Sequence, residues 1–135
     1  MSKVYAGGKL KSCLEAHPSF FEDATRAKKI IHDIAIGLSN LHKRNIVLHD
    51  LRMHNILMSD ESPTATACIA DFGLAQKLKS STDKLQWSVG ARYYMSPELI
   101  SKQPYGLGRD IWSLGCLSHA LLTRHYPFWN SDQDI

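Results

Sequence analysis

The sequence predicts a mostly α-helical fold of the α+β type that contains one small β-hairpin. One observation is a helical repeat of apolar residues that begins after residue 19 and continues to residue 41. Another is a nearly all-apolar segment, residues 110–122, which is typical of a buried helix. The third is a pair of short apolar segments, residues 55–58 and 67–70, joined by a polar connection. No linker divides the chain, so we expect one domain over residues 1–135.

The first half of the chain is expected to hold two helices. Residues 1–8 form an extended piece that ends in a turn, and residues 9–17 suit a short helix. Ser19, with Glu22 three residues later, forms a capping box that predicts the start of the long helix. That helix is expected to end near residues 43–45, where two cations suit the negative end of its dipole. Its apolar positions recur every three or four residues: Ala24, Ala27, Ile30, Ile31, Ile34, Ala35, Leu38 and Leu41.

The second half begins with short strands. Residues 46–48 suit a strand that leads into a loop, and the hairpin follows. Residues 74–95 lack a steady period and are expected to form a long loop. Pro97 suits the first position of a short helix, and Pro127 ends the last helical segment.

Composition and charge exclude several classes of function. The chain has 16 Lys and Arg against 13 Asp and Glu, a net charge of +3, and the excess is scattered, so we expect no nucleic-acid partner. Cys13, Cys68 and Cys116 lie far apart, which argues against a disulfide framework or a zinc site. No apolar run is long enough to span a membrane, and we expect a cytoplasmic protein without a membrane partner. The oligomeric state is left open.

Four short motifs in a fixed order carry the chemistry. Residues 48–58 place Asp50 five residues before Asn55, and Asp71 follows in an Asp-Phe-Gly turn. Ser96-Pro97-Glu98 and residues 110–115 complete the order. A carboxylate beside an attacking hydroxyl and hard oxygen ligands for Mg²⁺ are what phosphoryl transfer needs. The alternative is that Asp50 and Asn55 only cap a turn, as such residues often do.

This ordered set resembles the eukaryotic protein kinases. The resemblance covers all 135 residues and implies the large C-terminal lobe of the kinase fold, from the hinge to the central helix and truncated at both ends. Within the family, the chain is most similar to the polo-like kinases of the Sak type that act in centriole duplication, and the Nek kinases are next. The matching segments are residues 69–79, 94–98, 106–107, 110–116, 121–124 and 127–128.

The resemblance implies an ATP-dependent serine/threonine kinase that uses Mg²⁺ and acts on protein substrates. Asp50 would be the catalytic base or orienting carboxylate, with Arg52 beside it in the catalytic loop. Asn55 and Asp71 would be the Mg²⁺ ligands. A location at the centrosome or centriole is implied in the same way.

The resemblance also assigns the nucleotide and a structural carboxylate. The adenine would lie against the backbone around Lys3 to Tyr5, with Leu57 under its ring. Asp110 would hold the backbone of the catalytic loop.

The chain departs from the family at the catalytic loop and after it. The family usually has His-Arg-Asp, whereas this chain has Leu48-His49-Asp50. The family arginine grips a phosphorylated residue in the following loop, and a mostly neutral histidine cannot do so. Trp87 stands where the Sak type has its phosphorylated threonine, and Ala91 replaces a threonine that contacts the catalytic aspartate. We expect Leu48, which is still apolar, to pack against Phe72.

The 135 residues contain no glycine-rich phosphate loop and no strand lysine for the phosphates. We therefore expect the fragment to be inactive alone. A pseudokinase or a kinase-derived binding scaffold remains the alternative reading.

Overall fold

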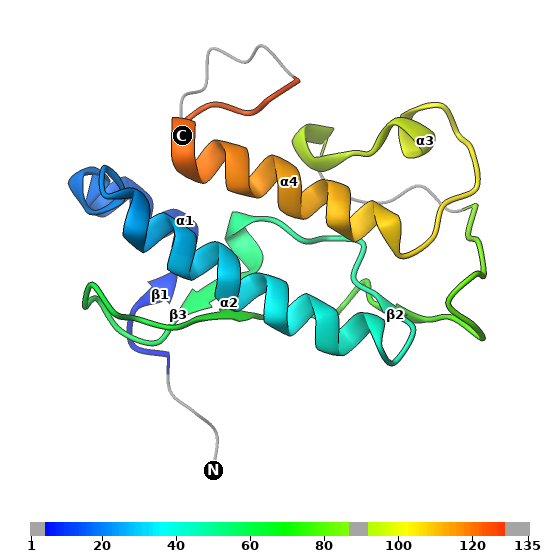
Figure 1. The fold of residues 1–135 in the computed structure, drawn as a ribbon, viewed down its shortest axis with the longest axis horizontal. Helices are drawn as coiled ribbons and strands as arrows, with labels where there is room; N and C mark the ends of the chain where they lie inside the picture. Colours follow the sequence, from blue (N-terminus) through cyan, green and yellow to red (C-terminus); the bar gives the residue numbers. More distant parts are fainter. Residues whose placement is uncertain (1–4, 87–91, 129–135) are drawn as a thin grey trace.

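Two long antiparallel helices lie side by side and form one layer of the molecule (Figure 1). The computed structural model describes residues 5–86 and 92–128. Helix α2 spans Ala24–His42 and helix α4 spans Gly108–Thr123. The shorter helices are α1, Leu10–Ala16, and α3, Pro97–Ile100. Three 3-10 helices complete the helical structure of the described residues: Pro18–Phe21, Met53–Asn55 and Arg92–Tyr94.

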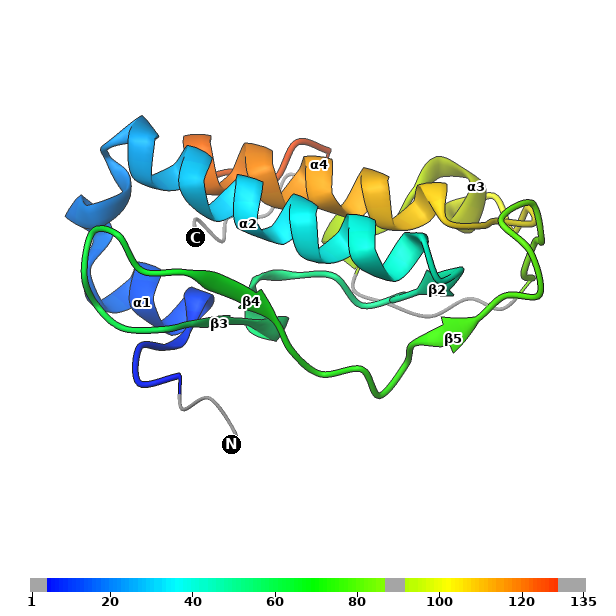
Figure 2. The same cartoon turned by 60° about the horizontal axis from the view of Figure 1, so that its bottom comes forward.

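Two small antiparallel sheets lie below the layer that α2 and α4 form (Figure 2). Strands β3, Ile56–Met58, and β4, Ala67–Ile69, form the predicted hairpin, with Leu57 directly opposite Cys68. Strand β1, Gly8–Lys9, adds a third strand to this sheet, in the order β1-β3-β4. Strand β2, Ile46–Val47, pairs with β5, Gln76–Lys77, inside the segment that the sequence predicts as a long loop. The predicted hairpin is therefore correct but incomplete.

An acidic side chain of α2 fixes the hairpin to the helix layer. The Asp33 carboxylate accepts a hydrogen bond from the backbone N–H of Ala67, at 3.1 Å. The same oxygen lies 2.8 Å from Lys29 Nζ, which also donates to the carbonyl of Ala65. β4 is the edge of its sheet, so this carboxylate satisfies a backbone donor that no further strand pairs.

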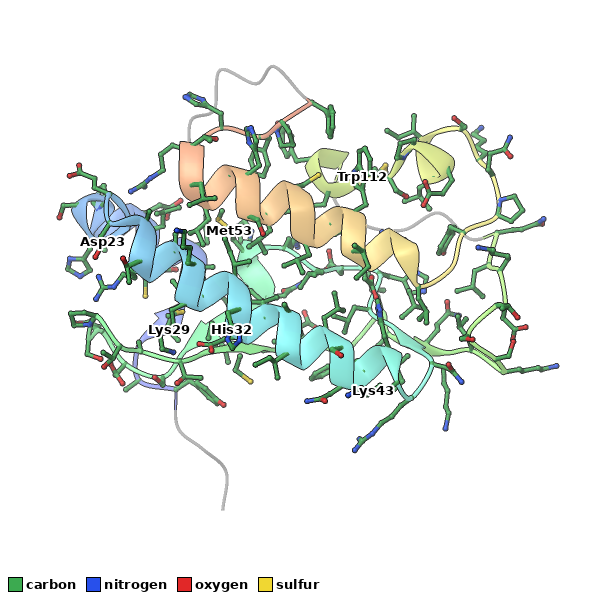
Figure 3. All side chains as sticks on the ribbon, viewed as in Figure 1. Asp23, Lys29, His32, Lys43, Met53 and Trp112 are labelled. Atoms are coloured by element: carbon green, nitrogen blue, oxygen red, sulfur yellow. The ribbon has the colours of Figure 1, made fainter. Side chains whose placement is uncertain are left out.

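The start of α2 corrects the predicted capping box. The N-cap is Asp23, whose Oδ1 accepts from the backbone N–H of Thr25 at 2.9 Å (Figure 3). Ser19 instead lies inside the 3-10 helix that begins at Pro18, and its carbonyl accepts from the N–H of Glu22. Because the 3-10 turn uses these residues, the α-helix begins four residues later than a Ser19 cap requires. The predicted end is correct to within a few residues, since α2 stops at His42.

The hydrophobic core lies where the helix layer meets the loop between β2 and β3. Helix α2 buries four positions of the predicted repeat, Ala27, Ile30, Ile34 and Leu38. Helix α4 contributes Leu117 and Leu121, and both are fully buried. The loop between β2 and β3 contributes Leu51 and Met53, and Met53 is visible between the two helices in Figure 3. The loop that carries the sequence motif is thus part of the core.

Helix α4 is not buried on all sides. Its residues Ile111 and Leu122 are 55% and 49% exposed, although the sequence predicts a helix buried all round. One face packs on α2 and the motif loop, and the described residues leave the opposite face open. Trp112 lies at this outer side of α4, away from α2 (Figure 3).

Candidate active site

The loop that follows β2 is held in place by one buried carboxylate of α4. Asp110 is fully buried, and its Oδ2 and Oδ1 accept from the backbone N–H groups of Leu48 at 2.8 Å and His49 at 3.2 Å. His42, at the end of α2, contacts the same carboxylate through Nε2 at 2.9 Å. The geometry agrees with the expectation that Asp110 holds the backbone of the catalytic loop.

Asp50, Arg52 and Asn55 come together in this loop. Asn55 Nδ2 donates to the backbone carbonyl of Asp50 at 2.7 Å and to its Oδ2 at 3.0 Å. Arg52 Nε lies 3.2 Å from Asp50 Oδ1, in an ion pair whose arginine is one-third exposed. Asn55 is buried, whereas the Asp50 side chain keeps 17% of its surface exposed. The two contacts hold the carboxylate in one orientation while leaving it accessible.

Asp71 follows β4 and is connected to Asn55 through the backbone. The N–H of Ala70 donates to the carbonyl of Asn55 at 2.8 Å, which extends the β3–β4 pairing to the residue before Asp71. Asp71 has a left-handed backbone, with φ of 61°, and its Oδ1 accepts from the N–H of Gly73 at 3.1 Å. The carboxylate is exposed. Left-handed aspartates are uncommon and concentrate in turns and at functional sites.

The residues expected to bind the adenine lie on the sheet side of the molecule. Leu57 is half-buried at the centre of β3, opposite Cys68. The Tyr5 hydroxyl interacts with the Cys68 thiol, and this hydrogen bond raises the pKa of Tyr5. Tyr5 and Leu57 therefore both lie next to Cys68 of β4. Lys3 lies outside the described residues, as do Trp87 and Ala91.

Phe72 occupies a different place from the one expected. It is 51% exposed and lines a groove with residues of α2 and β4, among them Gly37, Leu41 and Ile69. Leu48 is buried in the main core. Phe72 directly follows Asp71, whose backbone is left-handed.

A polar network around His49 is the part of the site that sequence reasoning missed. His49 is 1% exposed, with its Nε2 2.7 Å from Gln76 Oε1 of β5. Its Nδ1 lies 2.8 Å from Arg109 Nη1 of α4 and 3.2 Å from the hydroxyl of Tyr105. Burial, and then the charge of Arg109, lower the pKa of His49 below its usual value. The only sequence signal for this network was the substitution at position 49 itself.

The donor set suits a hard divalent cation. Because Asn55 Nδ2 is committed to Asp50, the amide oxygen Oδ1 is turned the other way, and Asp71 offers a carboxylate oxygen. Mg²⁺ prefers such oxygens and takes one or two protein ligands together with substrate phosphates. Among the described residues, no three His, Cys, Asp or Glu side chains cluster as a metal site of their own. The predicted pair thus fits a cation that arrives with phosphate oxygens.

Comparison with known families identifies the family of the chain. The protein kinase domain model matches residues 1–135. The chain belongs to the protein kinase family. The prediction from the four motifs is therefore confirmed.

Several serine/threonine kinases are similar to this kinase chain. The serine/threonine-protein kinase PLK4 of Drosophila yakuba is 38% identical over 104 residues, 77% of the chain and 13% of that protein. The human serine/threonine-protein kinase Nek5 is 38% identical over 95 residues, 70% of the chain and 13% of that protein. The calcium/calmodulin-dependent protein kinase type II alpha chain of Drosophila melanogaster is 33% identical over 130 residues, 96% of the chain and 24% of that protein.

These relatives confirm the resemblance to a polo-like kinase and to the Nek kinases. All three of these relatives are protein kinases, and two of them, PLK4 and Nek5, are named as serine/threonine kinases. The chain spans between 13% and 24% of the length of these relatives. In the described part of this kinase chain, no helix combines the length and the apolar character that crossing a membrane requires.

Proposed function

We propose that this chain is the large lobe, from hinge to central helix, of a kinase that transfers phosphate from ATP to serine or threonine of proteins. The observation that carries the proposal is the pairing of Asp50 with Asn55 in a loop that Asp110 fixes to α4. Positioning and electrostatic stabilisation supply most of the catalysis of phosphoryl transfer, and this loop supplies positioning.

Each side chain then has a distinct task. Asp50 orients the hydroxyl of the protein substrate and accepts its proton, and Arg52 holds that carboxylate from the solvent side. Asn55 and Asp71 would hold Mg²⁺, and Leu57 with the backbone around Lys3 and Tyr5 would hold the adenine. When bound, MgATP supplies the phosphoryl group and the positive charge that balances its oxygens. A cytoplasmic location, at the centrosome or centriole, belongs to the same proposal.

The metal assignment can be tested on the chain itself. Titration with Mg²⁺ and ATP together is expected to move the NMR signals of Asn55 and Asp71, and Asp71→Asn should weaken this response. Asp60→Asn is a matched control, because Asp60 Oδ1 also accepts from the N–H two residues later, at 2.7 Å. Equal effects of both variants, or no movement at Asn55, would contradict the assignment.

The catalytic assignment is tested by phosphoryl transfer. In the whole protein that carries these residues, Asp50→Asn is expected to lower kcat by about 100-fold or more, since it removes the proton acceptor. The 135 residues alone are expected to show no measurable transfer, because their sequence contains no glycine-rich phosphate loop. Binding of MgATP without transfer by the whole protein would instead support a kinase-derived binding scaffold.

A further inference from the structure

The buried ring of His49 contacts two elements that lie far apart in the sequence, β5 and α4. Its Nε2 faces Gln76 of β5 and its Nδ1 faces Arg109 of α4, at 2.7 and 2.8 Å. Gln76 follows Asp71 by five residues, and His49 directly precedes Asp50. The ring therefore connects the loop of the candidate base, the segment after the candidate metal ligand, and helix α4.

The partners of His49 fix its tautomer. A guanidinium has only donors, so Arg109 must donate to Nδ1, and that nitrogen carries no proton. Nε2 then carries the proton and donates to the side-chain amide oxygen Oε1 of Gln76. The ring of Tyr105 packs edge-on against His49, with centroids 5.5 Å apart, and its hydroxyl lies 3.2 Å from Nδ1. Only the neutral ring with its proton on Nε2 satisfies Arg109 and Gln76 together.

We propose that Arg109 is a positioning residue of this kinase: by donating to Nδ1 of neutral His49, it holds the Asp50 loop between α4 and β5. The inference rests on the proposed kinase function. Arg109 is 1% exposed and its guanidinium lies 5.4 Å from the centre of the Tyr105 ring, so the cation is fixed in one place. The loop thus has a cation inside the fold, supplied by α4.

Protonation of His49 would break this arrangement. Both ring nitrogens would then be donors, and Nδ1–H would face the guanidinium of Arg109 at hydrogen-bond distance. Within residues 5–86 and 92–128, the charged or titratable groups around the ring include Arg109 and Asp110 from α4, Tyr105 before it, and Asp50 beside it in the chain; Gln76 from β5 is uncharged. Asp110 favours the protonated ring, but burial and Arg109 outweigh it. Acidification is therefore expected to release the loop.

The first test follows the His49 ring by NMR in the 135-residue chain. Wild type should show the tautomer with the proton on Nε2 and remain neutral below the usual histidine pKa of about 6.5. Arg109→Gln should raise the pKa of His49 and speed exchange of the Leu48 and His49 amides about tenfold. Arg109→Lys should partly restore both. Tyr105→Phe is the control, since it removes the other group at Nδ1 and leaves Arg109 in place.

The second test measures phosphoryl transfer by the whole protein as a function of pH. Arg109→Gln should lower kcat, leave KM for ATP within about twofold, and move the acid limb of the pH–rate profile to higher pH. A loss of fold would change both parameters and would not move that limb.

The inference is overturned if Arg109→Gln changes neither the titration nor the amide exchange of His49, or if the ring carries its proton on Nδ1. It is also overturned if Tyr105→Phe and Arg109→Gln move the acid limb equally. Failure of the kinase function is a separate result: in that case wild-type MgATP would leave Asn55 and Asp71 unperturbed while the His49 network behaves as described.

Discussion

Asp110 is a fully buried carboxylate whose charge is satisfied by several donors. Two are backbone N–H groups of the motif loop and one is the ring of His42, all between 2.8 and 3.2 Å. Burying a charge costs several kcal/mol unless such bonds replace water. Two of these bonds go to the backbone, so Asp110 holds the loop independently of its catalytic side chains. The position of Asp50 is thus determined from α4, sixty residues away in sequence.

At this same scale, His49 predicts how stability depends on pH. Its pKa is lowered in the folded state, so the unfolded chain binds the proton more tightly. The contribution of His49 to the free energy of unfolding is therefore greatest at pH 7 and above. It falls as the pH drops below the pKa of histidine in the unfolded chain, about 6.5. The loss continues until the pH passes the folded-state pKa, at about 1.4 kcal/mol for each pH unit between the two. Urea unfolding at a series of pH values between 7.5 and 5 measures this loss of stability.

Two variants separate His49 from other histidines. His49→Gln keeps an acceptor and a donor in the side chain but does not titrate, so its stability should fall less on acidification. His54 also has a pKa lowered by burial and by Arg52, but its side chain is exposed, so His54→Gln should flatten the profile less. An unchanged profile in His49→Gln would show that His49 is not the group responsible.

At the scale of the element, the N-terminus of α2 distinguishes the observed cap from the predicted one. Asp23→Ala removes the bond to the N–H of Thr25 and a negative charge near the positive end of the dipole. It should destabilise the chain by about 1 kcal/mol. Ser19→Ala should change stability by less than about 0.5 kcal/mol, because Ser19 is exposed outside the helix. Thermal unfolding measures both losses of stability. A larger loss in Ser19→Ala than in Asp23→Ala would instead support the capping box at Ser19.

The elements that the sequence predicts well are those long enough to show a period. Helix α2 repeats its apolar positions over five turns, and α4 is apolar over most of its length. Strands β1 and β5 have two residues each, too few for any alternation, and they form because partner strands are already in place. The Ser19 capping box does not form because the 3-10 turn that starts at Pro18 uses the same residues.

In the candidate site too, the sequence predicts residues that are close in the chain and misses contacts between distant ones. Asp50, Asn55 and Asp71 lie within one loop and one hairpin, so their order in the sequence already brings them near one another. The contact of Arg109 with His49 joins positions sixty residues apart and depends on how α4 packs on the loop. No local pattern encodes such a contact. Similarly, the half-exposed positions on α4 depend on what packs there, which hydropathy alone does not reveal.

At the scale of the whole molecule, the outer face of α4 departs from a closed core. Ile111 and Leu122 are separated by three helical turns and therefore share one side of the helix. Beside them, the rings of Trp112 and Phe128 stack with centroids 5.1 Å apart, and Phe128 is 62% exposed. A groove runs along this face, lined also by Gly115, His119 and Pro127. Contiguous exposed apolar surface of this kind favours association.

The 135-residue chain is therefore expected to self-associate through this face as its concentration rises. Ile111→Lys should weaken the association about tenfold or more, because burying one such side chain contributes about 1.5–3 kcal/mol. Ile36→Lys is the matched control: Ile36 is 50% exposed on α2, against 55% for Ile111, and the change in charge is the same. Sedimentation velocity over a concentration series measures the effect. Equal weakening by both variants would mean that added charge acts by general repulsion, and a chain that stays monomeric throughout would show that this face does not bind a second copy.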